Sequence, residues 1–368
     1  MRLPPKSSVT IPAVRALLAI VPLASAAFLC LAAFLPPSGF LSVALGLVLV
    51  FTVPSAVHHA EVIAHKVGEP FGTLVLALAV TIIEVALIVS LTIAGGPESA
   101  SLARDAIFAA VMIICNGVVG SCILLGGALH REQSFRVEGA APALAALVAL
   151  STLSLVLPTF TTSAPGPVYS PPQLAFAAVA SFLLWGVFVF AQTVRHRDYF
   201  LPPGDGNGPD AHLPAPGGLA TLASAALLLV ALVVVVGASK LLSPAIGALV
   251  KAAALPDAVV GIAIALLVLL PETTAALRAA RSNRLQTSMN LALGSALASI
   301  GLTVPAVVAV SLYSGVPLAL GLDSKNLVLL ALTFLVSAIT LVPGRTSLMQ
   351  GAVHLVVFAA FLFLSFVP

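Results

Sequence analysis

Long apolar segments alternate with short polar loops along the whole chain. The apolar segments are about 20 residues long, and within them apolar and polar residues do not alternate as they would in half-buried strands. About 20 residues is the length that a helix needs to cross a bilayer, and lipid leaves only helices or closed barrels as spanning structures. The pattern predicts an all-α polytopic membrane protein with about eleven transmembrane helices, near residues 14–35, 40–65, 70–95, 106–129, 138–160, 172–195, 217–250, 256–280, 288–313, 325–342 and 346–367.

Composition supports a lipid-embedded chain. Hydrophobic residues make up 60% and charged residues only 8%, against about 25% charged in soluble domains. The net charge of +3 is scattered, so no nucleic-acid partner is expected. Cys30, Cys115 and Cys122 all lie in apolar segments, which fits small hydrophobes better than a disulfide framework or a metal cluster. The first apolar segment lacks a clear cleavage site, so we expect an uncleaved helix.

Lys and Arg residues gather on one side of the expected membrane. If the N-terminus is cytoplasmic, the cytoplasmic side holds Arg2, Lys6, Arg15, Lys66, Arg131, Arg136, Arg195, Arg197, Arg278, Arg281, Arg284 and Arg345. The other side holds only Arg104, Lys240, Lys251 and Lys325. Cytoplasmic loops of membrane proteins are enriched in these residues. The bias predicts a cytoplasmic N-terminus and, with an odd number of spans, a C-terminus outside.

Two segments of the chain repeat the same arrangement of acids. Glu69 is followed 15 residues later by Glu84, and Asp257 is followed 15 residues later by Glu272. Both acids of the second segment lie 188 residues after their counterparts, in a chain with only 13 acids. The register therefore indicates an internal duplication.

An odd number of spans per copy inverts the second copy relative to the first. Five spans each predict two inverted repeats, an arrangement of secondary transporters whose site lies near the midplane between the copies. We expect an N-terminal tail with an extra helix (1–36), a first repeat (37–196), a linker loop rich in Pro, Gly and Asp (197–217) and a second repeat (218–368).

The acids within the spans suggest a chemistry. An ionised carboxylate on a helix in lipid costs at least about 2.5 kcal/mol, so Glu84 and Glu272 should face inward and share a cation or hold protons. Competition between a cation and protons for one carboxylate pair is an antiport mechanism. A single intramembrane glutamate can also be a structural hydrogen-bond partner. Glu69 and Asp257 lie at span ends, where they could line the ion pathway or simply begin a helix.

Polar groups follow each repeated glutamate in the next span. These are Asn116 in the first copy, and Ser295 and Ser299 in the second. Oxygen ligands suit a hard cation such as calcium. The alternative is that these side chains form hydrogen bonds between helices.

The repeated segments resemble the cation/calcium exchanger superfamily, and within it the ChaA-type calcium(sodium)/proton antiporters of bacteria, relatives of the CAX calcium/proton exchangers. The resemblance lies in residues 60–74 with the following Glu84, in 267–272, in the arginines at 278 and 281, and in 284–301. It implies a multi-pass protein of the bacterial inner membrane, with Glu84 and Glu272 binding cation or proton in turn and Asn116 beside them. It also implies that Glu61 and Glu69 lie at the cytoplasmic mouth.

The chain departs from the CAX pattern at several presumed ligands. CAX members carry Gly-Asn-Ala before each repeated glutamate, where this chain has Val80-Thr81-Ile82 and Val268-Leu269-Leu270. The glutamine of the second CAX repeat corresponds to Ala298. We expect Ca²⁺/H⁺ exchange that expels the cation from the cytoplasm, with Na⁺/H⁺ or K⁺/H⁺ exchange as the alternative.

Other classes of function lack their sequence features. His59-Ala60-Glu61 is not the His-Glu-x-x-His motif of zinc proteases, so an intramembrane enzyme is not expected. A passive channel would require a continuous polar pore, whereas the polar groups here cluster at one depth. The expected partners are a cation, protons and the lipid bilayer, without an organic cofactor, and a homo-oligomer is compatible with the sequence.

Overall fold

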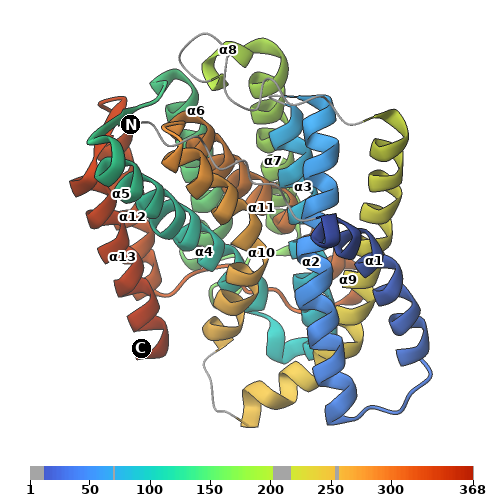
Figure 1. Cartoon of the computed structure of the whole chain (residues 1–368). Helices are drawn as coiled ribbons and strands as arrows, with labels where there is room; N and C mark the ends of the chain where they lie inside the picture. Colours follow the sequence, from blue (N-terminus) through green and yellow to red (C-terminus); the bar gives the residue numbers. More distant parts are fainter. Residues whose placement is uncertain (1–11, 69–70, 202–216, 253–256, 368) are drawn as a thin grey trace.

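In a computed structural model the protein is a bundle of long helices (Figure 1). The structure describes residues 12–68, 71–201, 217–252 and 257–367. The helices before the central loop are α1 (Pro12–Ala32), α2 (Gly39–Val67), α3 (Phe71–Gly95), α4 (Leu102–Met112), α5 (Val119–His130), α6 (Val137–Ser151), α7 (Pro171–Phe190) and the short α8 (Arg197–Phe200). Those after it are α9 (Gly218–Ala252), α10 (Asp257–Arg281), α11 (Leu285–Ser314), α12 (Ser324–Leu341) and α13 (Leu348–Phe366).

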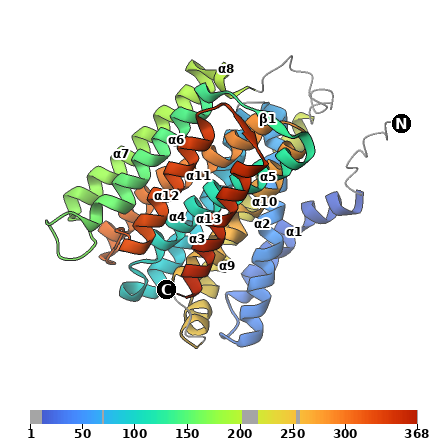
Figure 2. The ribbon, with the colours of Figure 1, turned by 90° about the vertical axis from the view of Figure 1, so that its left-hand side faces the viewer.

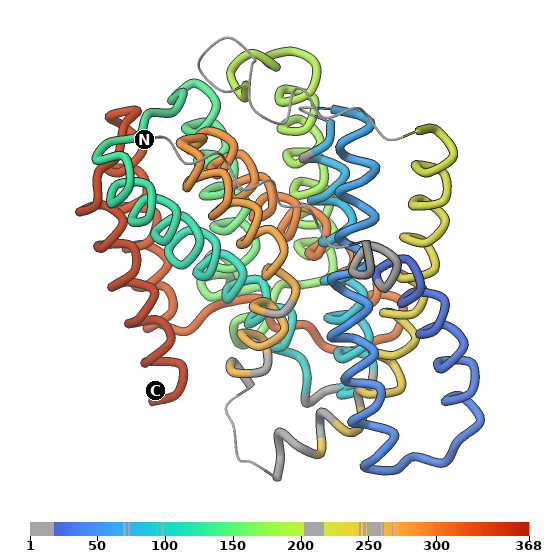
Figure 3. The backbone as a smooth tube through the Cα atoms, viewed as in Figure 1, coloured from blue at the N-terminus to red at the C-terminus, as the bar shows by residue number. Residues whose placement is uncertain are grey.

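Three of the long helical segments, here called rods, contain π-helical or 3-10 turns as well as α-helix. The π-helical turn η2 (Ile113–Val118) joins α4 to α5, so that these two helices form one rod, visible as a continuous tilted path in Figure 3. The rod of α6 continues through η3 (Thr152–Val156) and η4 (Leu157–Thr159), and that of α7 through η5 (Ala191–Arg195). A short 3-10 turn, η1 (Gly96–Ser99), follows α3.

The rods agree with the apolar segments of the sequence. Among the described residues, nine helical stretches are long and apolar enough to cross a membrane by length and composition, and a shorter apolar stretch covers Leu18–Ala32 of α1. The prediction of an all-α polytopic membrane protein is therefore confirmed, whereas the count of eleven spans stays a prediction.

Corresponding helices of the two halves make corresponding contacts. Helix α3 packs against α11 as α10 packs against α4, and α7 packs against α11 as α13 packs against α5. Helices α2 and α9, the first of each expected repeat, pack against each other. Figure 2 shows α6, α7 and α12 on one flank, α13 across the front, and α1 on the opposite flank beside α2. These reciprocal contacts support the predicted inverted repeat.

A two-stranded ribbon links the halves at the end of the molecule that carries the loops with Arg131, Arg284 and Arg345, here called the basic end. Strand β1 (Glu132–Ser134) pairs antiparallel with β2 (Arg345–Ser347). The buried amide of Gln133 donates to the carbonyl of Ala280 (2.9 Å) and to Oδ1 of Asn283 (3.0 Å). The ribbon thereby also contacts the loop between α10 and α11. It joins the end of α5 to the start of α11 at the basic end of the molecule.

Candidate functional site

The repeated glutamates meet in the interior of the bundle. Glu84 lies on α3 and Glu272 on α10, and their exposed fractions are 2% and 4%. The two carboxyl groups are close enough for their charges to interact. The structure therefore brings together the two residues that the duplication indicated.

Helix α11 supplies a hydroxyl to each glutamate. The Oγ of Ser299 donates to Oε1 of Glu84 at 2.6 Å, and the Oγ of Ser295 donates to Oε1 of Glu272 at 3.1 Å. The serines are four residues apart, so they share one face of α11. Because α11 packs against both α3 and α10, this one face reaches both carboxyl groups.

One oxygen of the site is without a partner. Among the described residues, Oε2 of Glu272 is buried and accepts no hydrogen bond. The preceding residue is Pro271, inside α10. A proline has no N–H, so the carbonyl four residues earlier lacks its usual helical partner. The free carboxylate oxygen and this carbonyl give α10 more unused acceptor capacity than an unbroken helix would have.

This geometry constrains the charge of the site. Two ionised carboxylates buried side by side repel each other and have lost their hydration, so the empty ionised state is costly. A bound cation or a proton on each carboxyl would relieve this cost. The four described side chains, Glu84, Glu272, Ser295 and Ser299, offer only oxygen atoms, the ligands that hard cations prefer.

Asn116 lies in a different polar cluster. It is fully buried in η2, where its Nδ2 donates to Oγ1 of Thr333 on α12 (2.8 Å) and its Oδ1 pairs with Nδ1 of His354 on α13 (3.2 Å). Neither Glu84 nor Glu272 is among its hydrogen-bond partners in the described part of the chain. The prediction that Asn116 completes the cation site stays a prediction, and in this conformation its amide is engaged elsewhere.

The predicted pathway residues are described to different extents. Glu61 is half-buried on α2, close enough to Arg278 on α10 for their charges to interact. Arg278 follows Glu272 by six residues, about 9 Å along a helix toward the basic end. The backbone of Asp257 begins α10, but its side chain is not described, and Glu69 lies outside the described residues.

Sequence reasoning missed the partners of Asn116. His354 had a signal, since an ionisable side chain within an apolar span calls for a partner. Thr333 had none, because threonines are common in membrane helices and their contacts depend on how the helices pack.

Sequence relatives place the chain among transporters. It is 51% identical over 314 residues to the ionic transporter y4hA of Sinorhizobium fredii, a match that covers 85% of each chain. It is 36% identical over 310 residues to the sodium-potassium/proton antiporter ChaA of Escherichia coli, covering 84% of each chain. Both relatives are named as transporters rather than as enzymes.

Solved structures show the same fold. Native YfkE superposes with a TM-score of 0.69 at 18% identity, covering 95% of this chain and 100% of that one. The H⁺/Ca²⁺ exchanger CAX gives 0.67 at 15% identity, covering 94% and 86%. Residues 37–194 and 223–367 match the sodium/calcium exchanger protein family. The chain belongs to this family.

Proposed function

We propose that the protein is a secondary active cation/proton antiporter whose exchange site is the pair Glu84 and Glu272. The observation that carries the proposal is the burial of two interacting carboxyl groups between α3, α10 and α11, with one oxygen of Glu272 left unpartnered. Such a pair is stable when it holds cation or protons and unstable when it is ionised and empty. Because the pair must always hold either cation or protons, the release of one requires the binding of the other, which is exchange.

Calcium is the first candidate for the cation. One Ca²⁺ balances two carboxylates, as two protons do, so the exchange would be electroneutral. Glu84 and Glu272 could supply four carboxylate oxygens, and the serine hydroxyls could supply two more, within the six to eight that Ca²⁺ takes. The exchange would use the proton gradient to expel the cation from the cytoplasm of a bacterium, across its inner membrane.

Sodium or potassium is the second candidate. It is favoured by the 36% identical relative, which is named for sodium and potassium. Among the described residues no side-chain amide is hydrogen-bonded to the paired carboxyls, and a cation of lower charge loses less hydration energy on entering a site with few ligands.

The test uses everted membrane vesicles in which a quenched dye reports an imposed pH gradient. Calcium, sodium and potassium are added separately to vesicles with the wild-type protein, Glu84→Gln or Glu272→Gln. We expect a cation to collapse the gradient in wild type and in neither variant. The matched control is Glu138→Gln, which neutralises an exposed glutamate in the first turn of α6 and should behave like wild type.

The outcomes separate the parts of the proposal. A response to calcium supports Ca²⁺/H⁺ exchange, and a response only to sodium or potassium keeps antiport and replaces the substrate. The proposed role of the glutamates is wrong if no cation moves protons, or if both variants transport normally.

A further inference from the structure

His354 is a buried histidine inside a membrane-crossing helix that the exchange chemistry does not use. It is fully buried on α13, and its ring joins three helical segments. Nδ1 pairs with Oδ1 of Asn116 on η2 at 3.2 Å, and Nε2 pairs with Oγ1 of Thr340 on α12 at 3.1 Å. The close approach needs Gly120, because a Cβ at that position would lie 2.8 Å from the Cβ of His354.

The neighbouring hydrogen bonds fix which ring nitrogen carries the proton. Thr333 donates its hydroxyl to the carbonyl of Leu329 (2.8 Å) and accepts from Nδ2 of Asn116 (2.8 Å). Oδ1 of Asn116 is therefore an acceptor, so Nδ1 of His354 must be the donor. Nε2 is then free to accept from the hydroxyl of Thr340. One neutral tautomer gives both ring nitrogens a partner, in a chain of donors from Thr340 to Leu329, and Sδ of Met112 is a second acceptor near Thr333 (3.3 Å).

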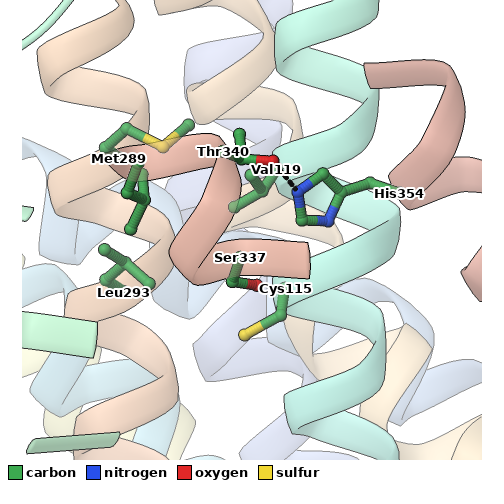
Figure 4. Close-up of a pocket in the computed structure, with 8 residues that line it drawn as sticks. Cys115, Val119, Met289, Leu293, Ser337, Thr340 and His354 are labelled. Atoms are coloured by element: carbon green, nitrogen blue, oxygen red, sulfur yellow. Dashed lines mark hydrogen bonds between the residues drawn. The ribbon is translucent and has the colours of Figure 1, made fainter. Parts of the chain in front are cut away.

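The ring also borders a small cavity that reaches helix α11. Figure 4 shows His354, Thr340, Ser337 and Cys115 on its lining, with Met289 and Leu293 of α11. The space open to the centre of a water molecule is about 10 Å³, so it accommodates one water at most. No charged side chain is among the residues that line it, and Cys115 is the other titratable group there. The surroundings therefore favour the neutral ring.

This cluster lies beside the exchange site. The turn η2, which carries Asn116, packs against both α10 and α11. Leu293 of the cavity lining is two residues before Ser295, the hydroxyl partner of Glu272. A π-helical turn contains one residue more than an α-helical turn and is common at functional sites. Here the buried side-chain amide of Asn116 is held by side chains from α12 and α13.

We propose that His354 is a positioning residue for transport: as a neutral donor it holds the amide of Asn116 and so sets the π-helical turn against the two helices that carry Glu272, Ser295 and Ser299. The inference rests on the proposed antiport function. The positioning role needs only the neutral ring, in which both nitrogens already have hydrogen-bond partners. Its contribution is to the geometry of the site, and it acts through Asn116.

The test measures the half-saturating cation concentration and the pH dependence of transport. In His354→Ala, Oδ1 of Asn116 is left buried and unpaired, at a cost that corresponds to roughly a 5- to 100-fold change in an equilibrium. We expect the half-saturating concentration to rise within this range. His354→Gln can donate to Asn116 and accept from Thr340, so it should restore most of the affinity with the pH dependence of wild type.

A double-substitution comparison separates positioning from a general structural role. If His354 acts through Asn116, His354→Ala combined with Asn116→Ala should transport no worse than Asn116→Ala alone. Ser365→Ala is the matched control on α13, because its hydroxyl donates to the carbonyl of Phe361 on the same helix and to no other helix that the structure describes. Should His354→Ala fail to accumulate in the membrane, Thr340→Val removes only the donor to Nε2 and should still raise the half-saturating concentration.

Three results would overturn the inference. They are wild-type affinity in His354→Ala, additive effects in the double variant, and a shifted pH dependence in a folded His354→Gln protein. Thermal stabilisation of the purified variants by added cation provides a readout that does not require proton flux. A wild-type protein that binds cation without moving protons contradicts the antiport proposal, while a smaller stabilisation of His354→Ala still supports the positioning role.

Discussion

Ser299 provides a quantitative test of the site, because its hydroxyl links the two halves. It lies on α11 of the second half and donates to Glu84 on α3 of the first, at 2.6 Å, with both side chains buried. In Ser299→Ala this donor is removed without a large change in volume. A hydrogen bond to a charged group contributes about 1.5–3 kcal/mol, and about 1.4 kcal/mol corresponds to a factor of ten.

The effect should depend on pH in a defined direction. The hydroxyl stabilises the ionised carboxylate, which is the form that binds the cation, more than it stabilises the protonated form. When this hydroxyl is lost, the protonated carboxyl becomes more stable relative to the ionised carboxylate. The cation must then compete against protons that are held more tightly. We expect the half-saturating cation concentration to rise roughly 10- to 100-fold where protons compete, and the defect to shrink as the pH is raised and fewer protons must be displaced.

The assay is cation-dependent proton movement in everted vesicles at several pH values. The matched control is Thr303→Val, one turn further along α11, where a buried hydroxyl has no hydrogen-bond partner within the described part of the chain. Removing an unpartnered hydroxyl should change the half-saturating concentration by no more than about twofold. Equal behaviour of Ser299→Ala and Thr303→Val, or a Ser299→Ala defect that is independent of pH, would refute the reasoning.

Two further predictions concern packing and orientation. Gly351→Ala should lower the melting temperature, because the added Cβ would clash with the backbone nitrogen of Leu124. Gly186→Ala should not, because no described atom lies near its added Cβ. Equal melting temperatures of the two variants would contradict the packing of α5 against α13. In a protein whose native cysteines are replaced, Ser134→Cys at the basic end should react with an impermeant maleimide only from the cytoplasm and Ser314→Cys only from outside, and the reverse pattern would invert the predicted topology.

The sequence was sufficient to predict the helices and the meeting of Glu84 and Glu272 in the interior of the bundle, while their role in exchange stays a prediction. Apolar segments of about 20 residues have one common solution in lipid, so helices could be predicted from length alone. Glu84 and Glu272 stood out because the duplication kept both at the same offset. A buried acid that is not duplicated, such as Asp105, which forms an ion pair with Arg104 at 2.8 Å, offers no such signal.

The assignment of partners could not be predicted. Periodicity placed Ser295 and Ser299 on one face of a helix, but it could not show that they serve glutamates on two different helices. It also could not show that the amide of Asn116 faces α12 and α13. Both depend on the angles at which helices cross, and these follow from packing over the whole bundle rather than from any one segment.

The two repeats contribute unequally to the candidate site, which affects how cation and proton movement would be coupled. Both hydroxyls come from α11, while the corresponding rod of the first half engages its polar group, Asn116, away from the carboxyl groups. Glu84 has the short hydrogen bond, and Glu272 keeps the unpartnered oxygen beside a proline. A buried carboxylate oxygen without a partner is destabilising, so we expect the ionised empty site to be less stable than a site filled by cation or protons. Under the proposed antiport, the conformational change that exposes the site to the other side of the membrane should then occur only when cation or protons fill the site, which is the condition for exchange without leak.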